Sequence, residues 1–227
     1  MFRKLWAHLM GKKESPKKEN NIQPKIAGIS NRVFGIIKFI LGICLLPFVY
    51  ASTVSFINEF KLIEDSGRNF WVGLFSFLIV YLFIWEPAIV YAKGQRLLEL
   101  LFSFFKPLVR VAPFLLPVYT IVLFFAYIIL TFVFKSGGLI NYFVFLFGFS
   151  IGLHLVFSSK SMRSKQADFL KANYIFGFFF IYVINMILLA IFLSIIFEKF
   201  SLLNFSKSSL QLAKNIFHVV FKQLFTP

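Results

Sequence analysis

The chain has 227 residues, of which 59% are hydrophobic and 15% are charged. Soluble domains contain roughly 45–50% apolar and about 25% charged residues, so this composition excludes an ordinary soluble domain. The net charge of +15 comes mainly from Lys and Arg in the N-terminal tail and between apolar blocks, which favours orientation in a membrane over nucleic-acid binding. The single cysteine, Cys44, excludes an internal disulfide and a cysteine-based metal site.

Residues 1–32 form a basic tail, and residues 33–200 hold five apolar blocks separated by polar segments. A helix needs roughly 20 apolar residues to cross about 30 Å of hydrocarbon, and lipid offers no partner to unpaired backbone groups. The predicted fold class is therefore all-α, a polytopic transmembrane helix bundle of about five spans with amphipathic surface helices. The predicted spans are Val33–Ile57, Phe70–Ala92, Val111–Phe134, Ile140–Phe157 and Tyr174–Phe197.

Residues 201–227 differ from the five blocks, because apolar and polar side chains alternate there at helical spacing. This pattern predicts a basic amphipathic helix that lies among the lipid headgroups, with a tilted sixth crossing as the alternative. Its lysines and those of the tail favour a bilayer with anionic headgroups as a partner.

The distribution of Lys and Arg predicts the orientation. The tail carries eight, and the connections Lys93–Arg110 and Ser158–Asn173 carry four each, whereas the opposite loops carry only two and one. Cytoplasmic loops are enriched in Lys and Arg, so we expect a multi-pass protein of the plasma or inner membrane with a cytoplasmic N-terminus. Five spans then place the basic C-terminal helix outside, which is the weakest point of this topology.

Four polar residues in or beside the apolar blocks are candidates for function, since an ionisable group at the centre of a spanning helix costs roughly 2.5–3.5 kcal/mol. Glu86 is either an interfacial carboxylate or part of a polar cavity. His154 and Asn185 are expected to form hydrogen bonds between helices, and Asp168 to be a solvated loop carboxylate.

No catalytic motif is visible. The sequence contains no Gly-rich phosphate loop, no His-Glu-x-x-His and no Cys-x-x-Cys. Of the three histidines, His8 and His218 fall in predicted surface segments, so a multi-histidine zinc centre is difficult to assemble. We therefore expect no metal and no cofactor.

A family resemblance is carried by the stretch from Trp85 to Thr120. It reads Trp85-Glu86-Pro87, Val90-Tyr91-Ala92-Lys93-Gly94-Gln95-Arg96-Leu97-Leu98-Glu99-Leu100-Leu101 and Ala112-Pro113-Phe114-Leu115-Leu116-Pro117-Val118-Tyr119-Thr120. Over roughly residues 70–190 the chain resembles small membrane-embedded zinc metallopeptidases of the site-2-protease-like class. In those relatives a Pro-ended span leads to Gly-His-Glu-x-x-His, and Ala-Pro-aromatic-x-x-Pro-x-Tyr opens a later span. Leu153-His154-Leu155 and Gln166-Ala167-Asp168 are also similar.

The resemblance implies that the metal site has been lost. Gln95 stands at the first histidine position, Arg96 at the catalytic glutamate and Glu99 at the second histidine. A neutral amide is a poor zinc ligand, and a guanidinium repels the metal and has no lone pair to act as a base. An equally weighted interpretation needs no ancestry, because Lys93–Lys106 also has the composition of an amphipathic helix on the inner surface. Both interpretations argue against catalysis.

Three functions remain as hypotheses. The first is a non-catalytic membrane protein, related to an inactive intramembrane metallopeptidase, that binds a membrane-protein partner or a second copy of itself. The second is a small transporter or channel-like subunit with Glu86, His154 and Asn185 along one polar path. The third, a lipid-modifying enzyme that uses Glu86 or Asp168, is ranked last because no nucleophile–base pair is visible.

Overall fold

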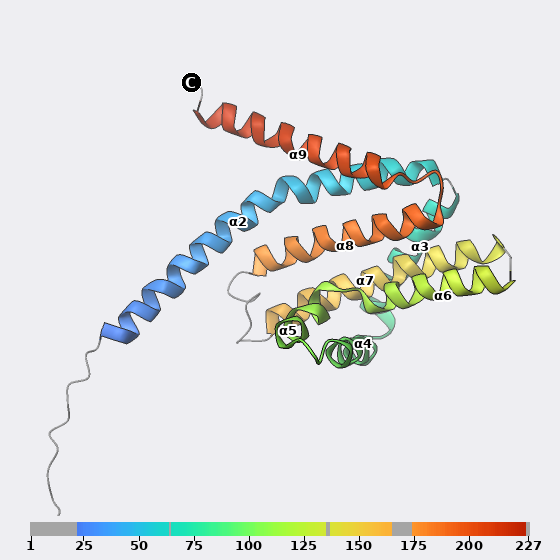
Figure 1. Ribbon diagram of the computed structural model, residues 1–227, viewed down its shortest axis with the longest axis horizontal. Coiled ribbons are helices and arrows are strands. Elements are labelled where there is room, and N and C mark those ends of the chain that lie inside the picture. The colour runs from blue at the N-terminus through green and yellow to red at the C-terminus, as the bar shows by residue number, and fades with distance from the viewer. Residues whose placement is uncertain (1–21, 64, 135–136, 165–173, 226–227) are drawn as a thin grey trace, which may run out of the picture. The chain divides into compact units, whose positions relative to one another are not determined.

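The computed structural model of the chain describes residues 22–63, 65–134, 137–164 and 174–225. The chain divides into two compact units, residues 1–37 and 38–227. The described part of the first unit is the beginning of a long helix, α2, whose remainder lies in the second unit with all the other helices (Figure 1). The α-helices are α2 (Ile22–Phe60), α3 (Asp65–Ile79), α4 (Ala88–Leu101), α5 (Lys106–Leu115), α6 (Val118–Phe134), α7 (Ile140–Ser164), α8 (Tyr174–Ile196) and α9 (Leu202–Phe225).

The all-α prediction is confirmed, since the described residues contain helices and no strand. Four segments are long and apolar enough to cross a membrane, namely Val33–Ile63, Ser66–Ile84, Ile140–Met162 and Tyr174–Ile196. The shorter apolar helix α6 has 17 residues, which is at the lower limit for a crossing. The chain is therefore a membrane protein by the length and composition of its helices.

Two predicted spans are interrupted at prolines. The second predicted span continues from α3 through a π-helical turn, Val80–Ile84, and stops at Trp85, whose backbone is extended (φ −161°, ψ 140°). A residue before proline avoids the helical region, and proline itself has no N–H, so Pro87 explains why a separate helix, α4, begins at Ala88. The third predicted span is likewise two helices, α5 and α6, separated at Leu116 and Pro117.

The closest helix pair is α3 and α7, and three glycines make this closeness possible. A Cβ built on Gly148 would lie 2.0 Å from the carbonyl oxygen of Phe70, and one built on Gly73 would lie 1.9 Å from that of Phe145. A Cβ on Gly152 would lie 2.7 Å from Cδ1 of Phe77. Small residues let membrane helices approach at backbone distance, so these two helices form the tightest part of the bundle.

The core beside this pair is built largely from phenylalanine. Phe56, Phe60 and Phe70 lie within 6.1 Å of one another by ring centroid, and Phe124 stacks on Phe192 at 4.3 Å. Offset and edge-on ring contacts of this kind add to the free energy of burial. They connect α2, α3, α6 and α8 around the α3–α7 pair.

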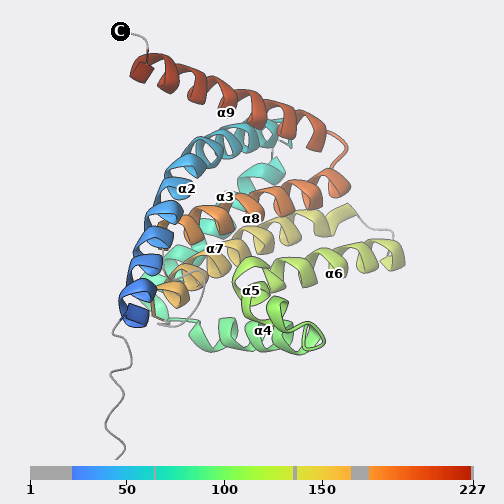
Figure 2. The ribbon, with the colours of Figure 1, turned by 60° about the vertical axis from the view of Figure 1, so that its left-hand side comes forward.

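Helix α4 crosses the long helices instead of running along them. It is seen nearly end-on in Figure 1, where α6, α7 and α8 lie across the view, and it turns into profile in Figure 2. Only one side of it is buried, through Tyr91, Gly94 and Leu98. This arrangement fits the amphipathic-helix interpretation of Lys93–Lys106, although the helix itself ends at Leu101.

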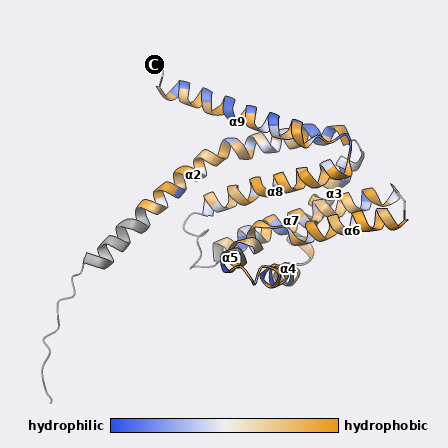
Figure 3. Cartoon of the chain, in the orientation of Figure 1, coloured by the Kyte–Doolittle hydropathy of each residue, from blue (hydrophilic) through white to orange (hydrophobic). Residues whose placement is uncertain are grey.

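Helix α9 returns alongside α2. Its first turn is fixed by Glu59, whose carboxylate accepts a hydrogen bond from the N–H of Ser201 at 3.1 Å. The ring centroid of Phe205 lies 6.4 Å from that of Phe56, and the ring centroid of Phe217 lies 5.9 Å from that of Phe48. Figure 3 shows polar and apolar colours alternating along α9, whereas α6 and α8 are almost uniformly apolar.

Candidate functional site

The junction between α5 and α6 is a helix break inside the bundle. Pro117 has no N–H with which to bond the carbonyl of Pro113, and Leu116 has left the helical conformation (φ −99°, ψ 125°). The N–H of Leu116 still donates to the carbonyl of Ala112 at 2.9 Å. An unpaired backbone group costs several kcal/mol in a medium without water, so the carbonyls of Pro113, Phe114 and Leu115 need other donors.

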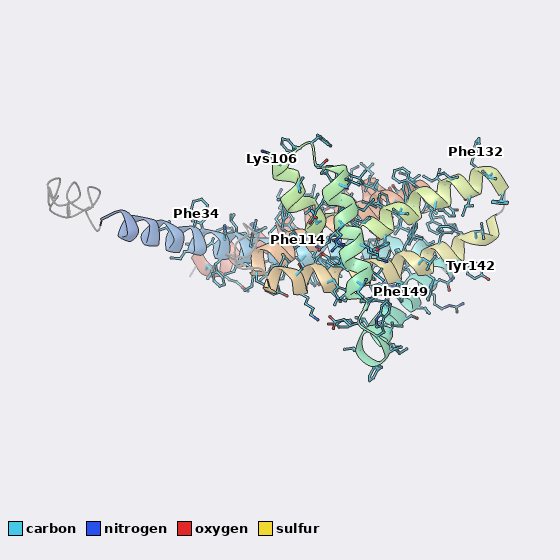
Figure 4. The ribbon with its side chains drawn as sticks, turned by 90° about the horizontal axis from the view of Figure 1, so that it is seen from below. Phe34, Lys106, Phe114, Phe132, Tyr142 and Phe149 are labelled. Atoms are coloured by element: carbon cyan, nitrogen blue, oxygen red, sulfur yellow. The ribbon has the colours of Figure 1, made fainter. Side chains whose placement is uncertain are left out.

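Three different helices provide those donors. Ser158 Oγ of α7 donates to the carbonyl of Phe114 at 3.2 Å. Asn185 Nδ2 of α8 donates to the carbonyl of Leu115, also at 3.2 Å. Tyr91 Oη of α4 lies 3.5 Å from the carbonyl of Pro113, which is a long contact. In Figure 4, Phe114 lies among the crossing helices, whereas Lys106, at the start of α5, lies at the edge.

These donors belong to a larger set of side chains, which we call the break cluster: Tyr91, Gln95, His154, Ser158 and Asn185. Gln95 Nε2 donates to Tyr91 Oη at 2.9 Å, and Tyr91 Oη lies 2.9 Å from Ser158 Oγ. Ser158 Oγ lies 3.3 Å from Nε2 of His154. The chain of contacts therefore runs from α4 to α7 without interruption.

Burial raises the pKa of Tyr91 to about 12, despite hydrogen bonds from Ser158 and Gln95 that act in the opposite direction. The phenol therefore stays protonated and neutral across the physiological range. A neutral hydroxyl can both accept from Gln95 and donate onward, which is what its position in the chain of contacts requires.

The three degenerate metallopeptidase positions do not share one environment. Gln95 is half-buried and bonds Tyr91 of the break cluster, whereas Arg96 and Glu99 are exposed. Gln95 and Glu99 are four residues apart and share one face of α4, as a His-x-x-x-His pair would, but Glu99 lies one turn further along and is exposed. Tyr119 of α6 holds α4 in position. Its Oη donates to the carbonyl of Val90, and its ring lies 2.9 Å from a Cβ built on Gly94.

A small cavity adjoins the break cluster and is lined in part by Tyr91, Gln95 and His154. Its volume is about 10 Å³, which is about the space that one water molecule needs. Among the described residues, no group of three or more His, Cys, Asp or Glu side chains is placed to hold a metal ion. The side chains of the break cluster can bond backbone carbonyls and one water. The volume of the adjoining cavity is too small for a substrate.

Of the three candidates for a shared polar path, His154 and Asn185 belong to the break cluster and Glu86 does not. His154 and Asn185 are almost fully buried, on either side of the end of α5, at 4% and 2% exposure. Glu86 is about half exposed and pairs with Lys160 of α7, and it lines neither the small cavity nor the break cluster. Asp168 lies outside the described residues. Among the described residues, Glu86 therefore has a different environment from His154 and Asn185.

Comparison with known proteins gives no family assignment. No family model, curated protein or solved structure matches this chain. The role of the break cluster therefore follows from its own contacts, and these contacts stabilise a broken helix.

Sequence reasoning missed two members of the cluster, Tyr91 and Ser158. In the sequence, Tyr91 stands within the stretch that carries the family resemblance, and Ser158 is the first residue of the basic connection Ser158–Asn173. A usable signal was the pair of prolines at 113 and 117, because a proline break inside an apolar block demands nearby side-chain donors. A second was Gly148-x-x-x-Gly152, a small-residue motif typical of close helix packing in membranes.

Proposed function

We propose that this chain is a non-catalytic polytopic membrane protein that binds a different, acidic membrane protein, and that α9 provides the binding surface. The observation that carries the proposal is a row of polar side chains on α9 that faces away from the bundle. We call this row the α9 polar stripe: Lys207, Gln211, Lys214, His218 and Lys222, all of them exposed.

The opposite face of α9 packs on the bundle, which fixes the direction of the stripe. Phe205 and Ala213 are buried, and Phe217 contacts Phe48. Phe48 is the central residue of the apolar segment Val33–Ile63. If α2 crosses a membrane over that segment, Lys214 and His218 lie close to its middle depth, because each is within one turn of Phe217.

A lysine at that depth, such as Lys214, needs a partner of opposite charge. An exposed lysine at the centre of a spanning helix costs roughly 2.5–3.5 kcal/mol on insertion scales, and such residues usually pair with opposite charges. A partner helix with carboxylates would pair with the stripe and bury it, as polar residues do between membrane helices. This placement also removes the difficulty of a basic helix on the outer surface, since α9 then returns towards the cytoplasmic side.

A second copy of this chain is a poorer partner. The whole sequence has 9 acidic against 24 basic residues, and α9 has no Asp or Glu. A two-fold contact of α9 with its own copy would place lysines against lysines. The acidic groups therefore come from another protein.

Lack of catalysis is the second half of the proposal. It is supported by the hydrogen bond that engages Gln95 with Tyr91, and by the residue types at the three positions of the resemblance, Gln95, Arg96 and Glu99, none of which is a histidine. The family resemblance is compatible with an inactive relative that retained partner binding. Zinc analysis of the purified protein and incubation with transmembrane peptides test this half, and stoichiometric zinc together with cleavage would refute it.

Site-specific photo-cross-linking tests the partner. A photoreactive residue at Gln211, in the stripe, is expected to give one distinct adduct with another membrane protein. The Lys207→Glu/Lys214→Glu variant is expected to abolish the adduct by charge repulsion. The same probe at Phe205, on the packed face, serves as the control and is expected to link within the chain. Adducts from Gln211 with lipid alone, or with a second copy, would contradict the proposal.

A further inference from the structure

A second cavity, separate from the break cluster, lies between the end of α7 and the beginning of α8. It has a volume of about 480 Å³ and is lined by Tyr81, Leu155, Val156, Ser159, Lys160, Tyr174 and Phe178. Binding sites for small molecules typically have volumes of roughly 300–1,000 Å³, so this cavity is large enough for part of a lipid.

The lining is ordered from polar to apolar along the helices. Ser159 and Lys160 are close to the last turn of α7, and Tyr174 is the first residue of α8, so the three are at the same end of the bundle. Leu155, Val156 and Phe178 lie four residues deeper, which is about 6 Å along a helix. The lining is polar at the mouth and apolar further in. A phospholipid has the same order, with a polar headgroup followed by acyl chains.

Two polar contacts frame the mouth. Ser159 Oγ hydrogen-bonds Tyr174 Oη between α7 and α8. The ammonium of Lys160 pairs with the carboxylate of Glu86, in the segment between the π-helical turn and α4. Both charged side chains are about half exposed, at 54% and 48%, so each keeps bonding capacity for a ligand.

The charge pair selects the kind of headgroup. A phosphate beside Lys160 also meets the carboxylate of Glu86, which repels an anion. A headgroup that carries both a phosphate and a primary ammonium satisfies both side chains, because the phosphate accepts from Lys160 and the ammonium donates to Glu86. The π-helical turn Val80–Ile84 contributes Tyr81 to the wall, and π-helical turns are frequent at functional sites.

We propose that this cavity binds one phospholipid of the phosphatidylethanolamine class. Its headgroup lies against the Lys160–Glu86 pair, and one hydroxyl of the Ser159–Tyr174 pair is a further donor to the phosphate. One acyl chain runs along Leu155, Val156 and Phe178. The bound lipid fills the space between α7 and α8 and links both helices to the segment that leads into α4.

Lipid binding to the purified full-length protein tests this site by native mass spectrometry. Phosphatidylethanolamine, phosphatidylglycerol and phosphatidylcholine with identical acyl chains are compared, together with water-soluble phosphoethanolamine. We expect phosphatidylethanolamine to bind about tenfold or more tightly than the other two, the effect of one charge-assisted hydrogen bond. Phosphoethanolamine without acyl chains is expected not to bind.

The variants separate the two halves of the headgroup. Lys160→Met is expected to weaken the binding of all three lipids about tenfold, and Glu86→Gln to remove only the preference for phosphatidylethanolamine. Val156→Trp fills the apolar wall without touching the charges and is expected to exclude the lipid. Lys199→Met, a charge loss in the turn before α9, is the matched control and leaves binding unchanged.

Helix content and monodispersity in detergent are measured for every variant, so that loss of binding is separated from loss of fold. Equal retention of the three lipids would overturn the proposal. So would a Glu86→Gln variant that keeps the preference, or soluble phosphoethanolamine that binds as well as the lipid.

Discussion

Replacement of Gly148 by alanine is expected to destabilise the bundle because it separates the closest helix pair. The new Cβ would lie 2.0 Å from the carbonyl oxygen of Phe70, whereas ordinary contact begins at 3.4 Å. The difference, 3.4 − 2.0 = 1.4 Å, is the approximate distance by which α3 and α7 must part at this point. A gap of about 0.5–1 Å already removes a quarter to a half of the attraction between two atoms, so contacts around the glycine are largely lost.

Gly148→Ala is expected to lower the free energy of unfolding by about 2 kcal/mol. Overpacking of a well-packed core typically costs about 1–3 kcal/mol, and the higher helix propensity of alanine returns up to about 1 kcal/mol. The measurement is the free energy of unfolding in detergent micelles titrated with sodium dodecyl sulfate. Gly35→Ala is the matched control, because a Cβ there meets nothing within 4 Å and only the propensity changes. A Gly148→Ala protein as stable as the wild type would refute the reasoning.

Three further predictions concern the break cluster, and the same unfolding titration measures them. Asn185→Leu removes the donor to the carbonyl of Leu115 and is expected to cost about 1 kcal/mol, within the range for hydrogen bonds between membrane helices; no loss would contradict the assigned role. Tyr91→Phe is expected to cost about 1 kcal/mol, and less in a Pro117→Ala background, where the new N–H can bond Pro113; equal costs in both backgrounds would exclude this coupling. Because burial raises the pKa of Tyr91 from 10.0 to about 12, the unfolded chain loses this proton first, and stability should fall as the pH rises through that interval. Tyr91→Phe should lose this part of the pH dependence, and an unchanged profile would show that the phenol does not contribute.

The helical class and the approximate positions of the apolar helices were predictable from sequence, because hydropathy over about 20 residues depends on local composition alone. Helices α7 and α8 begin in the structure at Ile140 and Tyr174, where the sequence places them, whereas α2 begins at Ile22, inside the predicted basic tail. The interruptions were less predictable. Pro87 and Pro117 are visible in the sequence, but a proline in an apolar block can kink a helix or divide it. Which of the two occurs depends on donors that come from elsewhere in the chain.

The members of the break cluster could not be assembled from sequence because their partners are distant along it. Ser158 bonds a carbonyl 44 residues away, and Asn185 bonds one 70 residues away. The hydrogen bond of Asn185 to Leu115 joins two helices, as the sequence predicts for isolated polar side chains in apolar blocks, whereas His154 lies 3.3 Å from Ser158 of its own helix. The sequence cannot tell that Asn185 bonds a backbone carbonyl freed by a proline, and it gives no information on the pairing of Glu86 with Lys160.

Polar groups in this bundle fall into two kinds, according to whether a backbone group needs them. The break cluster replaces missing backbone hydrogen bonds. The carbonyls at the end of α5 have lost their helical N–H donors and accept hydrogen bonds from side chains instead. The α9 polar stripe has no such role. Helix α9 is regular from Leu202 to Phe225, and its backbone hydrogen bonds are made within the helix. If α9 lies at membrane depth beside α2, as proposed, Lys207 and Lys214 bring a cost of insertion that the regular backbone of α9 does not explain. The proposed binding surface for an acidic partner would account for these lysines, whereas the broken helix accounts for Ser158 and Asn185.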